Sequence, residues 1–182
     1  MLCPQVPSKR SSVNLLMAGV EGVDLDLERT DVRELAPLTD NHPILEGSCA
    51  CGQVRYRATG PLTEMIHCHC SDCRKRHGAA FATHVGVPRE RFTFVQGQDM
   101  LQLYRSDSGT RRWFCRCCGS KMISEADGWR DTYFTAGTLD TPPAAPAQMH
   151  IFVRSKVGWY EIRDGHPQHS TYPIKWDEPA RD

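Results

Sequence analysis

The sequence lacks a net charge and a long apolar run. Its 182 residues contain 22 Lys and Arg against 22 Asp and Glu, which gives a formal net charge of +0 and a pI near 7.1. A neutral chain offers no overall field that would attract phosphate backbones or anionic lipids. No apolar segment approaches the roughly 20 residues of a membrane-spanning helix. We therefore expect neither nucleic acid nor a membrane as a partner.

Aromatic residues are absent from the first 40 residues, which carry seven acidic and four basic side chains. A segment of this composition buries too little apolar surface to fold alone. We therefore predict a flexible, acidic N-terminal arm at residues 1–41, one domain at residues 42–175 and a short C-terminal tail at residues 176–182. A chain of 182 residues leaves little room for a second full domain.

The cysteine pattern is not that of a disulfide framework. The chain has nine cysteines, an odd number, and most of them stand at C-x-C and C-x-x-C spacings that suit a shared metal ion. The N-terminal segment has no convincing cleavage site for a signal peptide. Because thiolate ligands persist in a reducing compartment, we expect a cytoplasmic, metal-binding protein.

Short strands separated by turns are the main pattern from residue 44 onward. Val54, Tyr56 and Ala58 alternate with polar residues, as in a half-buried strand. Residues 65–70 lead into Cys73 and one or two helical turns that end at Gly78. Because we find no repeat and no βαβ alternation, we predict a mainly β, mostly antiparallel domain with little helix. The other expected strands are residues 80–87, 91–96, 100–105, 110–114, 121–124, 133–137 and 150–153.

Two cysteine pairs far apart in the sequence predict a structural zinc site. Four thiolates close a tetrahedron around Zn²⁺, which is the usual arrangement of structural sites. A glycine follows each pair, as the tight turns of a zinc knuckle require. Cys117 is an alternative ligand to Cys118, which we prefer because C-x-x-C-G is the commoner knuckle. The predicted ligands are Cys49, Cys51, Cys115 and Cys118.

Three more cysteines, Cys68, Cys70 and Cys73, crowd into residues 65–78 and predict a second zinc. Three thiolates leave tetrahedral zinc one ligand short. Either a histidine fills the fourth position or the position stays open to water or a substrate thiol. We favour an open position, because the nearest histidines sit beside the ligands and reach the same metal only awkwardly. The candidate histidines are His67, His69, His84 and His150.

The charge of an open three-thiolate site points to thiol chemistry. Three thiolates around Zn²⁺ leave a net charge of about −1, so the metal polarises a carbonyl weakly but still holds an incoming thiol as the thiolate. We expect attack of a bound thiolate on an aldehyde, or the reverse cleavage of the carbon–sulfur bond. Basic side chains near the cysteines are candidates for binding the carboxylates of an acidic thiol. They are Arg74, Lys75, Arg76, Arg111 and Arg112.

Four segments of the chain resemble, in order and spacing, the glutathione-dependent formaldehyde-activating enzyme family, which also includes centromere protein V. The segments read GSCACGQVRY from Gly47, HCHCSDCRK from His67, FCRCCGS from Phe114 and HIFVRSKVGWY from His150. The resemblance covers roughly residues 44–173. One departure is Gly158, which stands where the family usually has proline.

The resemblance implies an Mss4-like β fold with two zinc ions per chain, divided between the cysteines as above, and with Cys68, Cys70 and Cys73 at the catalytic metal. It implies a carbon–sulfur lyase that handles a glutathione adduct of an aldehyde, with S-hydroxymethylglutathione as the product of glutathione and formaldehyde. A non-enzymatic thiol carrier and a protein-interaction module are the alternatives. The true substrate, the thiol-binding residues and the oligomeric state stay open.

Overall fold

The computed structural model describes residues 44–173, and the predicted arm at 1–41 and tail at 176–182 lie outside them. No helix in the described part of the chain has the length and apolarity to cross a membrane. Four 3-10 turns occur at Arg89–Arg91, Gln98–Met100, Ala136–Thr138 and Val153–Ser155. The other elements are β1 (Leu45–Ser48), β2 (Arg55–Ala58), β3 (Glu64–Cys68), α1 (Ser71–His77), β4 (Ala82–Pro88), β5 (Phe92–Gln96), β6 (Leu101–Arg105), β7 (Arg111–Cys115), β8 (Lys121–Glu125), β9 (Asp131–Thr135) and β10 (Met149–Ile151).

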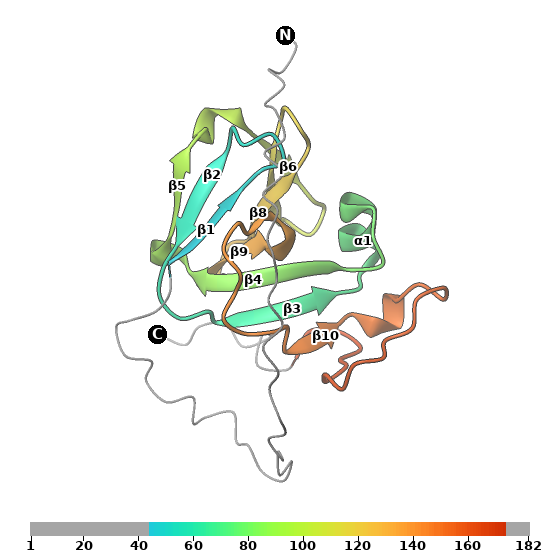
Figure 1. Ribbon diagram of the computed structural model, residues 1–182. Helices are drawn as coiled ribbons and strands as arrows, with labels where there is room; N and C mark the ends of the chain where they lie inside the picture. The colour runs from blue at the N-terminus through green and yellow to red at the C-terminus, as the bar shows by residue number, and fades with distance from the viewer. Residues whose placement is uncertain (1–43, 174–182) are drawn as a thin grey trace, which may run out of the picture.

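Strands dominate the described residues, so the prediction of a mainly β domain with little helix is confirmed. The strands form two sheets, one in the order β1-β2-β5 and the other in the order β10-β3-β4-β9-β8-β7-β6. All pairs within them are antiparallel except β10 and β3, which are parallel. Figure 1 shows β3 running toward α1 and β4 running back from it, with β1, β2 and β5 at the far side of the molecule.

Strand β1 is the one strand that none of the predicted segments contains. Its sequence, LEGS, is short and includes glycine and serine, so it carries no clear strand signal. Pairing with β2 explains it, because Gly47 lies opposite Tyr56. A Cβ atom at Gly47 would stand 2.2 Å from Cζ of Tyr56, so only glycine leaves room for the ring.

The core fills the space between the two sheets. The predicted inward face of β2 is confirmed, since Val54, Tyr56 and Ala58 are all at most 1% exposed. The Tyr56 ring lies 5.1 Å from Phe92 and 5.3 Å from Phe134, which joins the small sheet to the large one. Burying each such side chain contributes about 1.5–3 kcal/mol, so this cluster is the main attachment between the sheets.

The other face of the seven-stranded sheet carries a row of side chains that the strand register brings together. Ile66 pairs with His84 across β3 and β4, Tyr133 pairs with Ser124 across β9 and β8, and Ser124 pairs with Arg112 on β7. Directly paired residues, and residues two apart on one strand, point to the same face of a sheet. This face, which bears both Cys68 and Arg112, therefore forms the floor of the site described below.

Candidate functional site

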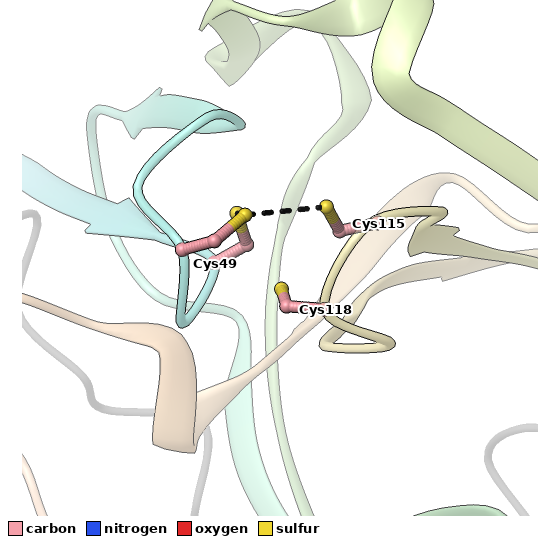
Figure 2. A group of neighbouring side chains, drawn as sticks. Cys49, Cys115 and Cys118 are labelled. Carbon is pink, nitrogen blue, oxygen red and sulfur yellow. Dashed lines mark hydrogen bonds between the residues drawn. The ribbon is translucent and has the colours of Figure 1, made fainter. Parts of the chain in front are cut away.

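The four predicted ligands of the structural site come together between two turns. Cys49 and Cys51 stand on the turn after β1, and they face Cys115, the last residue of β7, and Cys118, on the turn that follows (Figure 2). The sulfur of Cys51 lies 3.4 Å from that of Cys49 and 3.8 Å from that of Cys115. All four sulfurs lie within 4.8 Å of one another. We call this group the four-cysteine cluster.

Both turns have the geometry of a zinc knuckle. Gly52 and Gly119 adopt φ angles of 70° and 75°, and their amides donate to the carbonyls of Cys49 and Cys115, each at 2.8 Å. The Val54 amide points at the Cys49 sulfur from 3.3 Å. Zinc–sulfur bonds of about 2.3 Å in a tetrahedron separate the sulfurs by about 3.8 Å, so the observed cluster fits a zinc ion.

The choice between Cys117 and Cys118 follows the geometry of the second turn. The sulfur of Cys118, an exposed residue, belongs to the cluster, and Ser120 lies 3.3 Å from it. Cys117 is half-buried and packs against the hydrophobic core instead. The arrangement favours Cys118, as we expected, although its role as a ligand stays a prediction.

The second group consists of Cys68, Cys70 and Cys73, whose sulfurs also lie within 4.8 Å of one another. We call it the three-cysteine cluster. Cys68 ends β3, Cys70 caps the N-terminus of α1, and Cys73 lies in that helix. The Cys73 amide donates to the Cys70 sulfur at 3.3 Å. The predicted helical turns are present, and Gly78 ends them in the left-handed conformation that a helix C-cap favours.

The sulfurs of the three-cysteine cluster are close enough to shift one another's pKa. Hydrogen bonds from Cys68 and Cys73 lower the pKa of Cys70, and hydrogen bonds to Cys70 and Cys73, followed by burial, raise the pKa of Cys68. Because thiolates at this distance repel one another, a bound cation would favour the charged form of all three.

Two of the candidate histidine ligands point away from the cysteines. His67 shares a hydrogen bond of 2.9 Å with Thr83, and His69 shares one of 2.8 Å with His150. Successive side chains of an extended chain point to opposite faces, so the residues flanking Cys68 lie on the other side of the sheet. Burial lowers the pKa of both rings to about 4, which leaves them neutral at neutral pH.

His150 links this histidine pair to the C-terminal segment. Its Nε2 lies 3.0 Å from an Asp164 oxygen, while its Nδ1 faces His69, and the His150 side chain is fully buried. The backbone amide of His69 donates to the carbonyl of Ile151 at 2.9 Å. The chain Asp164–His150–His69 therefore holds the loop that carries Cys70 against β10.

His84 is the candidate histidine that lies beside the cysteines. Its Nε2 stands 3.6 Å from the sulfur of Cys73, and its Nδ1 is buried without a hydrogen-bond partner in the described residues. No histidine nitrogen of the described residues belongs to the group of three sulfurs. Burial, followed by the charges of His77 and Arg112, lowers the pKa of His84 and keeps the ring neutral.

A cavity of about 270 Å³ opens directly onto the three cysteines. Its apolar and aromatic lining, which we call the apolar wall, consists of Ile66, Ile151, Phe152, Tyr172, Trp129 and Tyr133. Its polar lining includes Arg112, Asp72, Ser108, Thr110 and Ser124. A concave site of this kind, with few polar groups and a cluster of reactive thiols, is the usual form of a small-molecule site.

Arg112 is the cation of this cavity. Its side chain is only 15% exposed, its Nη2 lies 2.7 Å from Asp72, and its Nη1 donates to the Ser124 hydroxyl at 3.4 Å. Its Nε is buried and has no hydrogen-bond partner in the described residues. An unused donor on a buried guanidinium is costly, so Arg112 is positioned to bind an oxygen of a ligand.

The other basic candidates face elsewhere. Arg74 donates to the carbonyl of His69 at 3.3 Å, Arg76 lies over the Tyr104 ring, and Arg111 pairs with Asp127. Neither Arg74 nor Lys75 lines the cavity, and their predicted binding to the thiol stays a prediction. Arg111 and Arg112 are neighbours on β7 and therefore point to opposite faces.

The cavity lining also includes residues that were not predicted from the sequence, among them Ser124, Trp129, Tyr133 and Phe152. Single hydroxyl and aromatic side chains on strands are common and carry no motif. Alternation along β8 and β9 would have grouped Ser124 with Tyr133 only if the pairing of the two strands had been known.

Comparison with known proteins identifies the family of this chain. Residues 44–155 match the family described as "Glutathione-dependent formaldehyde-activating enzyme". A Halomonas elongata protein named "Putative glutathione-dependent formaldehyde-activating enzyme" is 30% identical over 128 residues, which cover 65% of this chain and 81% of that protein. An uncharacterized lyase of Schizosaccharomyces pombe is 25% identical over 92 residues, which cover 50% of this chain and 65% of that protein.

A solved structure is also similar. The crystal structure of a Rhodobacter sphaeroides protein gives a TM-score of 0.46 at 24% identity and covers 54% of this chain and 91% of that one. The family match spans more than half of the present chain, and the matched segment contains all seven cysteines of the two clusters. The chain belongs to the glutathione-dependent formaldehyde-activating enzyme family, whose fold is Mss4-like and mainly β.

Proposed function

We propose that the protein binds two zinc ions and acts as a carbon–sulfur lyase on the adduct of a thiol, such as glutathione, with an aldehyde such as formaldehyde. The four-cysteine cluster supplies a complete set of four ligands, and we assign it a structural role. The three-cysteine cluster supplies three ligands beside a cavity. This contrast is the observation that carries the proposal, because an open metal position next to a cavity is the arrangement of catalytic zinc.

The cysteines Cys68, Cys70 and Cys73 are the proposed ligands of the reactive metal. A zinc ion bound there supplies the positive charge that keeps an incoming thiol deprotonated. Cys68 ends β3 and Cys70 and Cys73 lie at the start of α1, so these two elements would hold the metal beside the cavity that all three cysteines line. The cavity beside the cluster receives the aldehyde carbon that the thiol sulfur attacks.

The reaction is a reversible addition without oxidation or reduction. The thiolate sulfur forms a bond to the carbonyl carbon, the π electron pair of the carbonyl moves to the oxygen, and the proton lost by the thiol ends on that oxygen. The reverse reaction breaks the carbon–sulfur bond and restores thiol and aldehyde. Arg112, with its unused Nε and its neighbour Ser124, is the proposed donor to the oxygen as negative charge develops.

The proposed function is tested by metal content and thiol binding on matched variants. We expect two zinc ions per wild-type chain and saturable binding of glutathione. We expect Cys70→Ser to lose the binding of glutathione and one zinc, and Cys117→Ser, a cysteine outside both clusters, to keep both. A wild-type protein that takes up no glutathione would remove the proposal.

A measurement of turnover distinguishes an enzyme from a thiol carrier. Glutathione and formaldehyde also combine without a protein, so the rate of approach to equilibrium must be measured at a protein concentration far below that of the reactants. An enzyme accelerates this approach and leaves the final ratio unchanged. A protein that only shifts the ratio in proportion to its own concentration is a thiol carrier, and the lyase assignment is then wrong.

A further inference from the structure

The cavity beside the three-cysteine cluster holds more than the smallest aldehyde needs. Formaldehyde adds a single carbon and one oxygen to the thiol sulfur. The cavity has a volume of about 270 Å³, whereas an apolar protein cavity of about 150 Å³ is already large enough for benzene. The space next to the reacting sulfur therefore accommodates a group of ring size in addition to the reacting carbon.

The apolar wall of the cavity, next to the cysteines, is suited to binding an apolar group. Ile66 stands two residues before Cys68 on β3, and Ile151 lies opposite Cys68 on β10, so all three side chains share one face of the sheet. Two aromatic pairs close the wall, Phe152 against Tyr172 with ring centroids 4.5 Å apart, and Trp129 against Tyr133 with centroids 5.2 Å apart. Such surfaces bind aromatic or branched aliphatic groups.

The backbone of Phe152 adds an independent indication. Phe152 has a φ angle of 56°, and no other non-glycine residue of the described chain has a positive φ. A bulky residue in the left-handed region is strained, and such strain persists where the surrounding structure uses it. Here it places an aromatic side chain on the cavity wall one residue after β10.

The body of glutathione is a poor occupant for this wall. At neutral pH glutathione carries two carboxylates and one ammonium group besides its thiol. Among the described residues that line the cavity, Arg112 is the one Arg or Lys, and it is already paired with Asp72. Burying further charges without partners is unfavourable. The charged body of the thiol therefore extends out of the cavity, and the apolar wall is left to the second reactant.

We propose that the second reactant is an aldehyde with an apolar side group of about the size of a phenyl ring, and that formaldehyde is a minor substrate. The proposal rests on the function proposed above. In the reaction the thiol R–SH and the aldehyde R′–CHO give R–S–CH(OH)–R′, with the carbon–sulfur bond formed at the aldehyde carbon and the thiol proton transferred to its oxygen. The group R′ packs against Ile66, Ile151 and Phe152, and the hydroxyl oxygen faces Arg112.

The experiment compares aldehydes with one thiol on the zinc-loaded protein. Glutathione is combined with formaldehyde, isobutyraldehyde or phenylacetaldehyde, and both the rate of approach to equilibrium and the amount of adduct bound to the protein are measured. We expect the adduct of phenylacetaldehyde to bind at least about tenfold more tightly than that of formaldehyde, because each buried methylene contributes a factor of about four. The rates follow the same order.

Two variants and a control locate the effect. Phe152→Ala and Trp129→Ala reduce the preference for phenylacetaldehyde over formaldehyde about tenfold and leave the binding of free glutathione unchanged. Trp159→Ala is the control, because Trp159 is 75% exposed and does not line the cavity, and it keeps the wild-type preference. If either cavity variant fails to fold, the comparison of the three aldehydes on the wild-type protein still tests the preference for an apolar aldehyde.

The outcomes distinguish this inference from the function beneath it. Equal or stronger binding of the formaldehyde adduct, with glutathione binding intact, overturns the apolar-aldehyde assignment and leaves the thiol function standing. Preferential binding of the phenylacetaldehyde adduct without any acceleration supports the assignment and shows that the protein is a carrier. Failure to bind glutathione or either adduct overturns both.

Discussion

The two cysteine clusters place the same side chain in two different settings. The four-cysteine cluster joins residues that are far apart in the chain, since Cys115 is 64 positions after Cys51. It therefore connects the turn after β1 to the end of β7 and the turn that follows. The three-cysteine cluster comes from one short stretch, residues 68–73, at the junction of β3 and α1. A metal in the four-cysteine cluster would close a long loop of the chain, whereas a metal in the three-cysteine cluster would close only a loop of a few residues.

Their surroundings differ as well. The four-cysteine cluster offers four sulfurs and so fills a tetrahedral metal with protein ligands. The three-cysteine cluster offers three sulfurs beside a cavity that contains a buried arginine. The comparison shows that ligand number and the neighbouring space, not the presence of cysteines, separate a structural from a reactive candidate site.

The largest effect is expected from removing a ligand that ties the sheets together. Cys115→Ser should unfold the domain, because Cys115 is fully buried and structural zinc contributes on the order of 10 kcal/mol to the folding of small metal-dependent units. Circular dichroism and chemical denaturation measure the outcome. A Cys115→Ser protein with the wild-type denaturation midpoint would show that this cluster does not support the fold.

Removing a ligand of the other cluster should have a smaller effect on stability. Cys68→Ser is expected to stay folded, lose one zinc ion and lose glutathione binding, because the strands and turns around Cys68 are held by backbone pairing with β4 and β10. Metal analysis, near-UV circular dichroism and glutathione titration measure this. A molten Cys68→Ser protein would erase the distinction between the two clusters.

A change in the cavity should affect the reaction and spare both metals. Arg112→Gln is expected to slow the addition of thiol to aldehyde by on the order of 10²-fold, since it removes a donor to the developing charge. Arg111→Gln is the matched control, because the neighbouring guanidinium pairs with Asp127 at the surface. Equal rates for the two variants would mean that Arg112 only pairs with Asp72.

The smallest effect is expected from the histidine chain behind the three-cysteine cluster. His150→Gln should weaken zinc binding at that cluster by about tenfold and leave the four-cysteine cluster unchanged. His150 holds the loop that carries Cys70 through His69, and contacts that orient metal ligands typically affect metal affinity by about 10- to 100-fold. Stepwise chelation measures the two affinities separately. His169→Gln is the control, because the backbone of His169 pairs with that of His150. An equal loss of zinc affinity in both variants would mean that the substitutions only loosen this part of the structure.

The sequence was informative where patterns are local. The alternation of Val54, Tyr56 and Ala58 predicted the buried face of β2, and the cysteine spacings predicted both groups that the structure brings together. It was uninformative for β1, whose four residues form a strand only because β2 lies beside them. The predicted domain bounds at residues 41–42 and 175–176 remain predictions.

Long-range pairing decided what local patterns left open. The sequence named Arg111 and Arg112 as equivalent candidates, and only the pairing of β7 with β8 turned Arg112 toward Ser124 and the cavity. From the sequence, His84 was one of four candidate histidine ligands. Only the register of β4 against β3 brought His84 beside Cys73.

By itself the sequence determined that seven cysteines form one group of four and one of three, because ligand spacing and the glycines of tight turns are local properties of the chain. Only the tertiary structure decided which group faces a cavity, which arginine enters it and that an apolar wall stands beside the sulfurs. These features depend on how six strands of one sheet, from β10 to β7, align side by side, and that alignment is set by packing between residues distant in the sequence.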